Sequence, residues 1–365
     1  MKNSFGQSII VTLFGESHGA AVGAVIDGLA PGIPVSEKDI AAALDKRRPT
    51  GNYSTARVEK DAFSIISGVY KGRTTGTPLT LLIQNENVKS GDYEKTERLA
   101  RPGHADYTAE CKYHGFQDPA GGGHFSARLT APLVAVGAIA RAALKEKGVS
   151  VTLRITEIAG VKDAPLRDPA HQLPALESAA FPVLDEAQGE KMKEAILSAA
   201  REGDSVGGVL EGIVTGVPAG VGEPWFDSVE SLLSHMLFSI PAVKGVEFGD
   251  GFALCRMRGS EANDPFRKGE NGTVTVTNHG GGINGGITNG MPIVFRLAVK
   301  PTPSIYKTQK TVSLDTGENA DITVAGRHDP CVVHRAAAVA EAATALVLMD
   351  LLAARFGTDY FCPQK

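Results

Sequence analysis

An ordered internal repeat is the feature of this 365-residue sequence that most constrains its fold. Four patterns from the first part of the chain recur in the same order in the second part, with offsets between 188 and 214 residues. The matched pairs are residues 25–33 and 213–221, 61–63 and 250–252, 72–78 and 286–292, and the alanine-rich segments that begin at Arg128 and at Arg335. Repeated order predicts repeated structure. We therefore predict one domain over residues 1–365, built from two similar halves at about 1–200 and 201–365.

Local patterns predict both strands and helices. Ser36 is a typical N-cap and predicts a helix ending at Lys46. Ser126 or Thr130 begins a long helix of small residues that reaches Lys147. Short apolar runs bounded by turn residues predict strands at 8–14, 21–29, about 61–69 and 79–84. The mixture indicates an α+β fold in which apolar helices are buried between sheets.

Composition excludes several classes of protein. The net charge is −4 and the pI is near 6.2, so no basic field attracts nucleic acid or an anionic membrane. The four cysteines lack C-x-x-C spacing, which argues against a zinc site or a disulfide framework and fits a reducing compartment. The longest apolar stretch, 336–354, contains two acidic residues and is typical of a buried helix. We expect a cytoplasmic protein with no membrane or nucleic-acid partner.

Five of the nine histidines lie beside a glycine, which points to loops built around imidazoles. His18 lies in a predicted turn between strands, where glycines let the backbone approach a ligand. Arg101, His104 and Asp106 lie within six residues of one loop. A histidine can donate or accept a proton near neutral pH while an arginine holds an anion. Asp106 either orients His104 or caps the next turn.

The glycine run 121–123 precedes a predicted helix, an arrangement that favours phosphate binding. It matches neither the dinucleotide fingerprint nor the P-loop. Asp329 precedes the last helix, and on spacing alone an N-cap is its better interpretation. Basic residues that would form a cationic pocket for a small polyanion are Lys46, Arg47, Arg48, Arg101, Arg128, Lys300 and Arg327, although 46–48 alone also fits a solvated helix end.

Metal and hydrolase chemistry are poorly supported. No H-x-x-x-H or H-E-x-x-H motif occurs, so we expect no metal. Ser17 adjoins His18, but adjacent residues in a strand turn point apart and no G-x-S-x-G motif is present.

Taken together, the motifs resemble the chorismate synthase family over about residues 5–352. The segments that carry the resemblance are FGESHG at 14–19, the basic cluster at 46–48, RPGHADYT at 101–108, GGG-x-x-SAR at 121–128, GEP-x-FD at 222–227, GVEFGDGF at 245–252, NHGGGINGGI at 278–287 and GRHDPC at 326–331. The resemblance implies a layer of long helices sandwiched between two four-stranded antiparallel sheets, pseudo-symmetric halves and a homotetramer. It also implies 1,4-anti elimination of phosphate from 5-enolpyruvylshikimate 3-phosphate to give chorismate, a carbon–oxygen lyase reaction that needs reduced FMN without net redox change.

The resemblance also implies residue roles. His104 would protonate the departing phosphate, His18 would protonate or stabilise the reduced flavin, and Asp329 would assist flavin N5, in place of the N-cap role. Arg47, Arg48 and Arg128 would hold substrate anions, and Arg47 also matches a nicotinamide-dinucleotide position. Flavin contacts would come from His124, Phe125, Ser126, Pro241, Ala242, Gly285, Lys300, Pro301, Thr302, Pro303, Ser304 and Arg327.

The sequence departs from the family pattern at several contact positions. Many members have Arg-Ser-Ser at 124–126, Asn at Pro241, Ser at Pro303 and Arg at Asn52. Whether NADPH or a separate reductase reduces the flavin stays open. Two rival hypotheses are a flavin oxidoreductase acting on a phosphorylated metabolite and a non-enzymic FMN or phosphometabolite binding protein.

Overall fold

Two antiparallel five-stranded sheets organise this computed structural model, which describes residues 2–55, 60–86, 98–270, 272–324, 326 and 328–363. The first sheet has the order β1-β2-β3-β7-β4, with bounds Ser4–Phe5, Ile10–Gly15, Ala21–Asp27, Leu79–Gln84 and Phe63–Ser67. The second has the order β11-β16-β10-β8-β9, with bounds Val243–Phe248, Ile293–Val299, Gly208–Thr215, Ser150–Ile158 and Val161–Lys162. The α+β prediction is confirmed, but each sheet has five strands and not the four that the resemblance implies, because the short strands β1 and β9 extend the edges.

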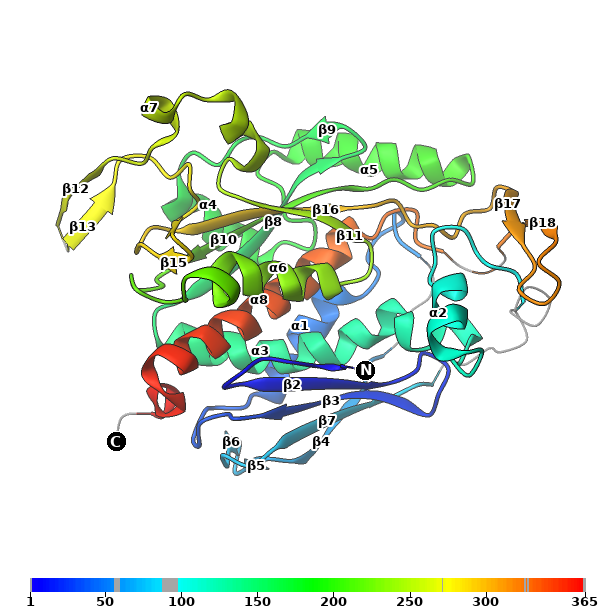
Figure 1. The fold of residues 1–365 in the computed structure, drawn as a ribbon, viewed down its shortest axis with the longest axis horizontal. Coiled ribbons are helices and arrows are strands. Elements are labelled where there is room, and N and C mark those ends of the chain that lie inside the picture. Colours follow the sequence, from blue (N-terminus) through cyan, green and yellow to red (C-terminus); the bar gives the residue numbers. More distant parts are fainter. Residues whose placement is uncertain are drawn as a thin grey trace.

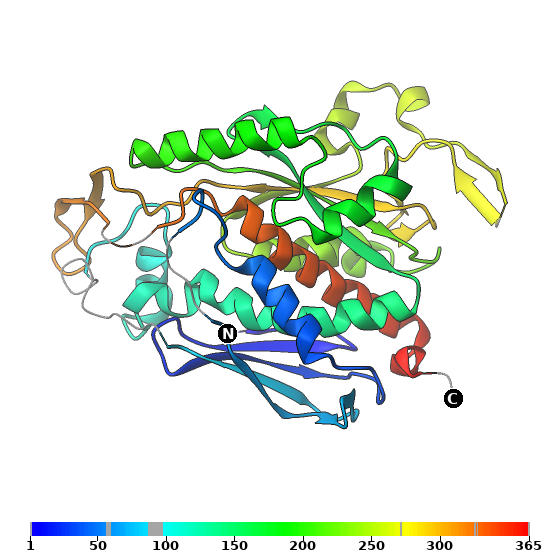
Figure 2. The same ribbon diagram turned by 180° about the vertical axis from the view of Figure 1, so that it is seen from behind.

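Three helices lie between the two sheets: α1 (Glu37–Arg47), α3 (Thr130–Glu146) and α8 (Val333–Phe356) (Figures 1 and 2). Helix α6 (Val229–Ser239) packs on α8 and β11, while α5 (Glu186–Arg201) covers the outer side of the second sheet. The other helices are α2 (Asp106–Tyr113), α4 (Pro169–Ser178) and α7 (Gly259–Ala262), and the 3-10 helices are η2 (Ala120–Phe125), η3 (Ala127–Leu129), η4 (Trp225–Asp227), η5 (Gly251–Arg256) and η6 (Thr358–Phe361). The small hairpins are β5–β6 (Val69–Tyr70, Arg73–Thr74), β12–β13 (Phe266–Gly269, Gly272–Thr275), β14–β15 (Ile283–Asn284, Ile287–Thr288) and β17–β18 (Gln309–Val312, Asn319–Ile322).

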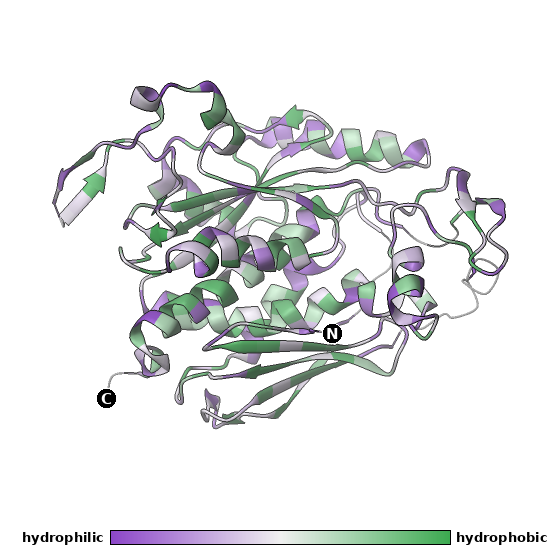
Figure 3. Cartoon of the chain, in the orientation of Figure 1, coloured by the Kyte–Doolittle hydropathy of each residue, from purple (hydrophilic) through white to green (hydrophobic). Residues whose placement is uncertain are grey.

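The core lies around α3 and α8. In α8 almost every residue from Val333 to Ala353 is buried, and the central helices are mostly apolar in Figure 3. Strand β7 alternates, so Leu79, Leu81 and Ile83 are fully buried. Two helical segments, 127–146 and 333–356, are long and apolar enough to cross a membrane, but their apolar windows are 83% and 100% buried inside the protein. They are therefore core helices.

The predicted helix starts are confirmed in detail. Ser36 is the N-cap of α1, and its side chain accepts a hydrogen bond from the backbone N–H of Asp39. Both candidate residues mark the start of the long helix. Ser126 caps η3 by accepting from the N–H of Arg128, and α3 itself begins at Thr130.

The sequence repeat corresponds to repeated contacts. In the first part, Thr74 Oγ1 donates to the Ala30 carbonyl at 2.6 Å and accepts from the Ile33 N–H at 2.9 Å. At the matching positions, Thr288 Oγ1 donates to a carbonyl, that of Pro218, at 2.7 Å and accepts from the Val221 N–H at 3.0 Å.

Strand pairing follows the same repeat. Ile26 pairs with Leu79, and their counterparts Val214 and Ile293 pair as well. The 61–63 match behaves differently, since it leads into β4 whereas 250–252 begins the 3-10 helix η5. We propose on these contacts that the chain consists of two structurally similar halves. Strand β8 pairs with β10 as β2 pairs with β3, so the second half would begin before β8 and not at the predicted residue 201.

Candidate active site

A cavity of about 810 Å³ opens between the edge of the first sheet, the start of α3 and the end of α6. Ligand pockets of small-molecule enzymes have volumes of about 300–1,000 Å³. Its walls combine apolar side chains such as Leu13, Leu133 and Val339 with an excess of cations over the two lining acids, Asp106 and Asp118. The lining cations are Lys2, Arg47, Arg98, Arg101, Lys244, Lys300 and Arg335. A ligand with an apolar body and anionic groups would complement this surface.

His104 lies in the cavity wall just before α2. Its Nε2 is 2.7 Å from Ser304 Oγ, so a residue 200 positions away fixes the ring. Nδ1 makes no hydrogen bond to the residues that the structure describes. Burial, followed by the charges of Arg101 and Lys300, lowers the pKa of His104 to about 4. The imidazole of the protein without a bound anion is therefore neutral at pH 7.

Asp106 holds Arg101 rather than His104. Its carboxylate accepts from Arg101 Nε and Nη2, each at 2.7 Å, and from the Arg101 backbone N–H at 2.9 Å. The guanidinium keeps the pKa of Asp106 below its ordinary value although burial opposes this. The expectations that Asp106 orients His104 or caps a turn are both wrong, because its oxygens are occupied by the arginine.

The glycine run 121–123 forms a turn in which Gly121 leaves no room for a side chain. All three residues have positive φ, at 59°, 86° and 51°. A Cβ on Gly121 would lie 2.0 Å from His18 Cε1. The turn thus seats the His18 ring against Gly121, which lines the cavity. Ser17 Oγ lies 3.0 Å from His18 Nδ1, so the expectation that these two side chains point apart is wrong. His124 lines the cavity as well, with Nδ1 2.9 Å from the Gly15 carbonyl, to which it donates.

Asp61 joins two of the predicted substrate arginines, and sequence reasoning missed this role. Its carboxylate is fully buried and pairs with Arg47 at 3.1 Å and with Arg128. Arg47 also donates to Thr130 Oγ1 at 2.8 Å and lines the cavity. Arg128 is not among the lining residues of the described chain. The only sequence signal was the place of Asp61 in the repeat, which does not reveal its partners.

Most predicted flavin positions meet at this cavity. Those that line it are His124, Phe125, Ser126, Pro241, Ala242, Lys300, Thr302 and Pro303. Lys300 Nζ donates to the Gly103 carbonyl at 2.6 Å, next to His104.

The other predicted positions are not among the described residues that line the cavity. Pro301 and Ser304 are not lining residues, and Gly285 lies in the turn between β14 and β15. Arg48 pairs with Asp45 on the exposed end of α1. Arg327 lies outside the described residues. The roles of these residues stay predictions.

Asp329 is buried, 6% exposed, and is not among the lining residues. One oxygen accepts from Ser54 Oγ at 2.9 Å and from the Thr55 N–H at 2.8 Å, and the other pairs with Arg335. Arg335 does line the cavity. Sequence reasoning placed Arg335 only in the repeat, and it missed Arg98, His235 and Lys244 in the cavity wall.

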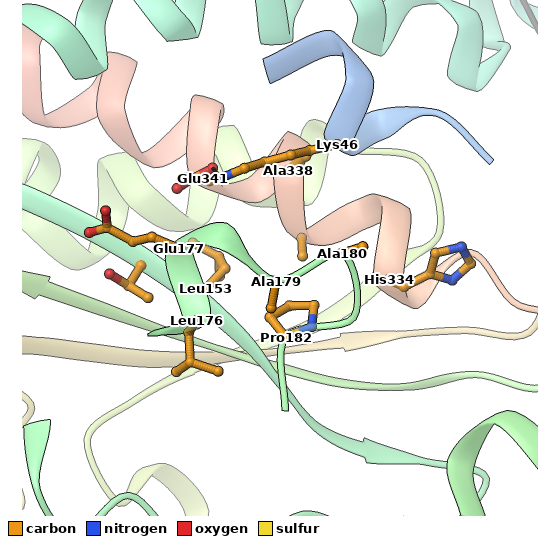
Figure 4. Close-up of a pocket in the computed structure, with 12 residues that line it drawn as sticks. Lys46, Leu153, Leu176, Glu177, Ala179, Ala180, Pro182, His334, Ala338 and Glu341 are labelled. Atoms are coloured by element: carbon orange, nitrogen blue, oxygen red, sulfur yellow. Dashed lines mark ion pairs between the residues drawn. The ribbon is translucent and has the colours of Figure 1, made fainter. Parts of the chain in front are cut away.

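A second, much smaller cavity of about 30 Å³ lies between α1, α8 and β8 (Figure 4). Lys46 and Glu341, which line it, form an ion pair at 3.9 Å. Such a volume holds only about two water molecules. The large cavity is therefore the candidate site for a metabolite.

A cationic cavity with a histidine in its wall is typical of an enzyme that acts on a small anionic metabolite. The comparisons with known proteins agree. Residues 9–353 match the chorismate synthase family. Curated relatives named chorismate synthase include those of Methanosarcina acetivorans, 48% identical over 95% of both chains, and Chitinophaga pinensis, 47% identical over 96% of both chains. A solved structure titled "Crystal Structure of Chorismate Synthase" superposes with a TM-score of 0.77 at 29% identity, covering 97% of this chain and 94% of that one.

The chain therefore belongs to the chorismate synthase family, and it is a lyase of the shikimate pathway to the aromatic amino acids.

Proposed function

We propose that this protein converts 5-enolpyruvylshikimate 3-phosphate into chorismate and phosphate in the cytoplasm. The observation that carries the proposal is the cavity itself, where His104 stands among Arg101, Lys300 and other cations beside apolar walls. The substrate has one phosphate and two carboxylates on a small ring. In the 1,4-elimination the carbon–oxygen bond to phosphate breaks, the C6 hydrogen leaves as a proton, and the electrons of its bond to carbon form the second ring double bond. On the family resemblance, Asp329 would assist flavin N5 in removing that hydrogen.

His104 is the proposed acid for the phosphate. A bound polyanion would compensate the positive charges that lower the pKa of His104. Binding would therefore raise the pKa of His104 and favour protonation of its imidazole. Because Nε2 is engaged by Ser304, Nδ1 is the nitrogen left to face the ligand. A proton held there can pass to the departing phosphate oxygen.

The cavity also suits reduced FMN. Its volume exceeds what the substrate alone needs, and its apolar side, formed by residues such as Leu13 and Met236, offers a surface for a flat ring. Lys300 and Thr302 would hold the flavin with His124, Ser126 and Ala242. Reduced FMN, when bound, supplies electron density to the allylic system without net oxidation. His18, held behind Gly121, would stabilise the reduced form from outside the wall.

We further propose the finer family features. These are the layer of long helices sandwiched between the two sheets, a homotetramer, and NADPH as a candidate reductant that would meet Arg47. Gly285, which lies away from the lining residues, belongs to the proposed flavin contacts on the resemblance alone, as does Arg327.

The test is anaerobic assay of the purified protein with dithionite-reduced FMN and 5-enolpyruvylshikimate 3-phosphate. Phosphate release that needs the reduced flavin supports the proposal. Binding of FMN or substrate with no phosphate release would favour the non-enzymic binding protein instead.

A further inference from the structure

Arg335 occupies the first turn of α8, where its side chain reaches the wall of the large cavity. We infer that Arg335 binds an oxyanion of the ligand there, a carboxylate or a phosphate, and that Asp329 is the positioning residue that aims it. The inference rests on the proposed function, because it requires a polyanionic ligand in this cavity.

The guanidinium of Arg335 is held on one side and open on the other. Nε donates to the Arg47 carbonyl at 2.8 Å, and Nη1 donates to Asp329. Nη2 makes no hydrogen bond to any residue in the described part of the chain. The side chain is 23% exposed although α8 is almost entirely buried. A guanidinium fixed at two nitrogens presents the third in a defined direction, which suits recognition of an oxyanion.

Its counterpart in the sequence repeat, Arg128, lacks this property. The nitrogens of Arg128 donate to Asn85 Oδ1 at 2.9 Å, to Asp61, and to the Gln84 carbonyl at 3.3 Å. Arg128 is only 6% exposed. Protein acceptors thus occupy all three nitrogens of Arg128, whereas Arg335 lines the cavity and has one nitrogen without an acceptor among the described residues. Of the two matched arginines, Arg335 is the one placed to meet a ligand.

Asp329 is joined to the cavity wall by its contact with Arg335. Ser54 and Thr55 hold one carboxylate oxygen, as described above, and Arg335 takes the other. The Asp329 side chain is 5% exposed, and both of its carboxylate oxygens accept hydrogen bonds from the protein. The carboxylate restrains the rotation of the guanidinium and neutralises part of its charge. Loss of Asp329 should therefore weaken ligand binding by releasing Arg335.

The experiment measures dissociation constants by titration calorimetry on the full chain, with 5-enolpyruvylshikimate 3-phosphate and with FMN in separate titrations. The variants are R335M, R335K, D329N and the double variant D329N/R335M. The matched control is R141M. Like Arg335, Arg141 is a partly exposed arginine, 29% exposed, that pairs with a buried carboxylate, in this case Glu341 at 3.1 Å, but Arg141 does not line the large cavity. Thermal unfolding of each variant confirms that it is folded.

R335M should weaken one of the two ligands by about 10-fold or more, the loss of a charge-assisted hydrogen bond. Weaker substrate binding assigns the oxyanion to the substrate, and weaker FMN binding assigns it to the flavin phosphate. R335K should lie between wild type and R335M. D329N should weaken the same ligand, and the double variant should be within about twofold of R335M, since Asp329 acts through the arginine.

The inference is overturned if R335M binds both ligands as R141M does. It is also overturned if the effects of D329N and R335M multiply, which would give Asp329 an independent role. If R335M does not fold, R335K and D329N carry the same test, with R141K as the control. These titrations measure binding and do not depend on turnover. A wild-type protein that binds both ligands without releasing phosphate would contradict the proposed function, while the dissociation constants of the variants would still decide the role of Arg335.

Discussion

Ser304 Oγ lies 2.7 Å from Nε2 of His104, and this contact joins the loop before α2 to the segment that follows β16. It gives Ser304 a role that the family resemblance did not imply. A hydroxyl at this distance fixes the ring orientation and directs Nδ1 to the cavity. Ser304 itself is 6% exposed and is not among the lining residues.

Ser304→Ala should therefore lower kcat by about 10-fold while changing the dissociation constant of FMN by less than twofold, because a misoriented general acid affects chemistry more than binding. Steady-state kinetics and FMN titration check this. Ser304→Thr, which keeps the hydroxyl, should recover part of kcat. A large loss of FMN affinity with unchanged kcat would instead favour the flavin-contact role.

Substrate binding should be accompanied by proton uptake at His104. The free protein has a His104 pKa of about 4, below the ordinary value of 6.5, and the bound polyanion raises it. The complex then holds more protons than the free protein, so affinity should increase as pH falls from neutral toward 4.

Calorimetry in buffers of different ionisation enthalpy measures this uptake directly. His104→Gln should abolish the histidine contribution and leave only the proton exchange of the substrate itself. Equal uptake by wild type and His104→Gln would exclude His104 as the group that takes up the proton.

His334 should make the fold sensitive to acid. The residue is 3% exposed, packs against Tyr53 and Phe181, and burial lowers its pKa to about 4. Between pH 6.5 and 4 the unfolded chain binds more protons at this position, so stability falls as pH falls through that window. The shift corresponds to roughly 3 kcal/mol.

His334→Phe keeps an aromatic ring and removes the titration, so its free energy of unfolding should fall less than that of the wild type between pH 6.5 and 4. Urea denaturation at each pH gives the comparison. His171→Gln, at an exposed histidine on α4, should follow the wild-type curve. Parallel curves for wild type and His334→Phe would show that His334 does not titrate in this window.

Asp61→Asn should destabilise the protein by about 3–5 kcal/mol, because it leaves the buried guanidiniums of Arg47 and Arg128 without their shared carboxylate. Asp61 has φ 49°, a conformation that asparagine tolerates, so the effect would come from charge. Glu190→Gln at an exposed pair with Lys193 should cost less than about 1 kcal/mol. Equal effects of the two substitutions in urea denaturation would contradict the structural role of Asp61.

Patterns that act locally predicted the fold well. Ser36 caps its helix as its spacing indicates, and the apolar alternation locates strands such as β7 to within a few residues. Caps and alternation depend on neighbours in the sequence, so they can be read without the tertiary structure. Partners that the tertiary structure selects cannot be read in this way. Asp106 lies only five residues from Arg101, but its spacing does not show that it pairs with Arg101 and not with His104. Asp61 pairs with Arg47 and with Arg128, 67 residues away, because the fold brings the three side chains together.

The residues of the cavity wall also differ in whether a local motif predicts them or only the tertiary structure reveals them. Motifs in loops predicted His104 and Lys300, because their glycines and prolines mark functional loops. Arg335 lies inside an apolar helix, where an arginine gives no motif, and only the packing of α8 brings it to the wall.

The proposed lyase reaction is tested most directly by the stoichiometry of a single anaerobic reaction in which phosphate, chorismate and the redox state of FMN are followed together. We expect equal amounts of phosphate and chorismate while the flavin ends as reduced as it began, and a strong loss of both products in His104→Ala. Oxidation of the flavin in proportion to substrate consumed, without phosphate release, would contradict the proposed reaction and identify an oxidoreductase.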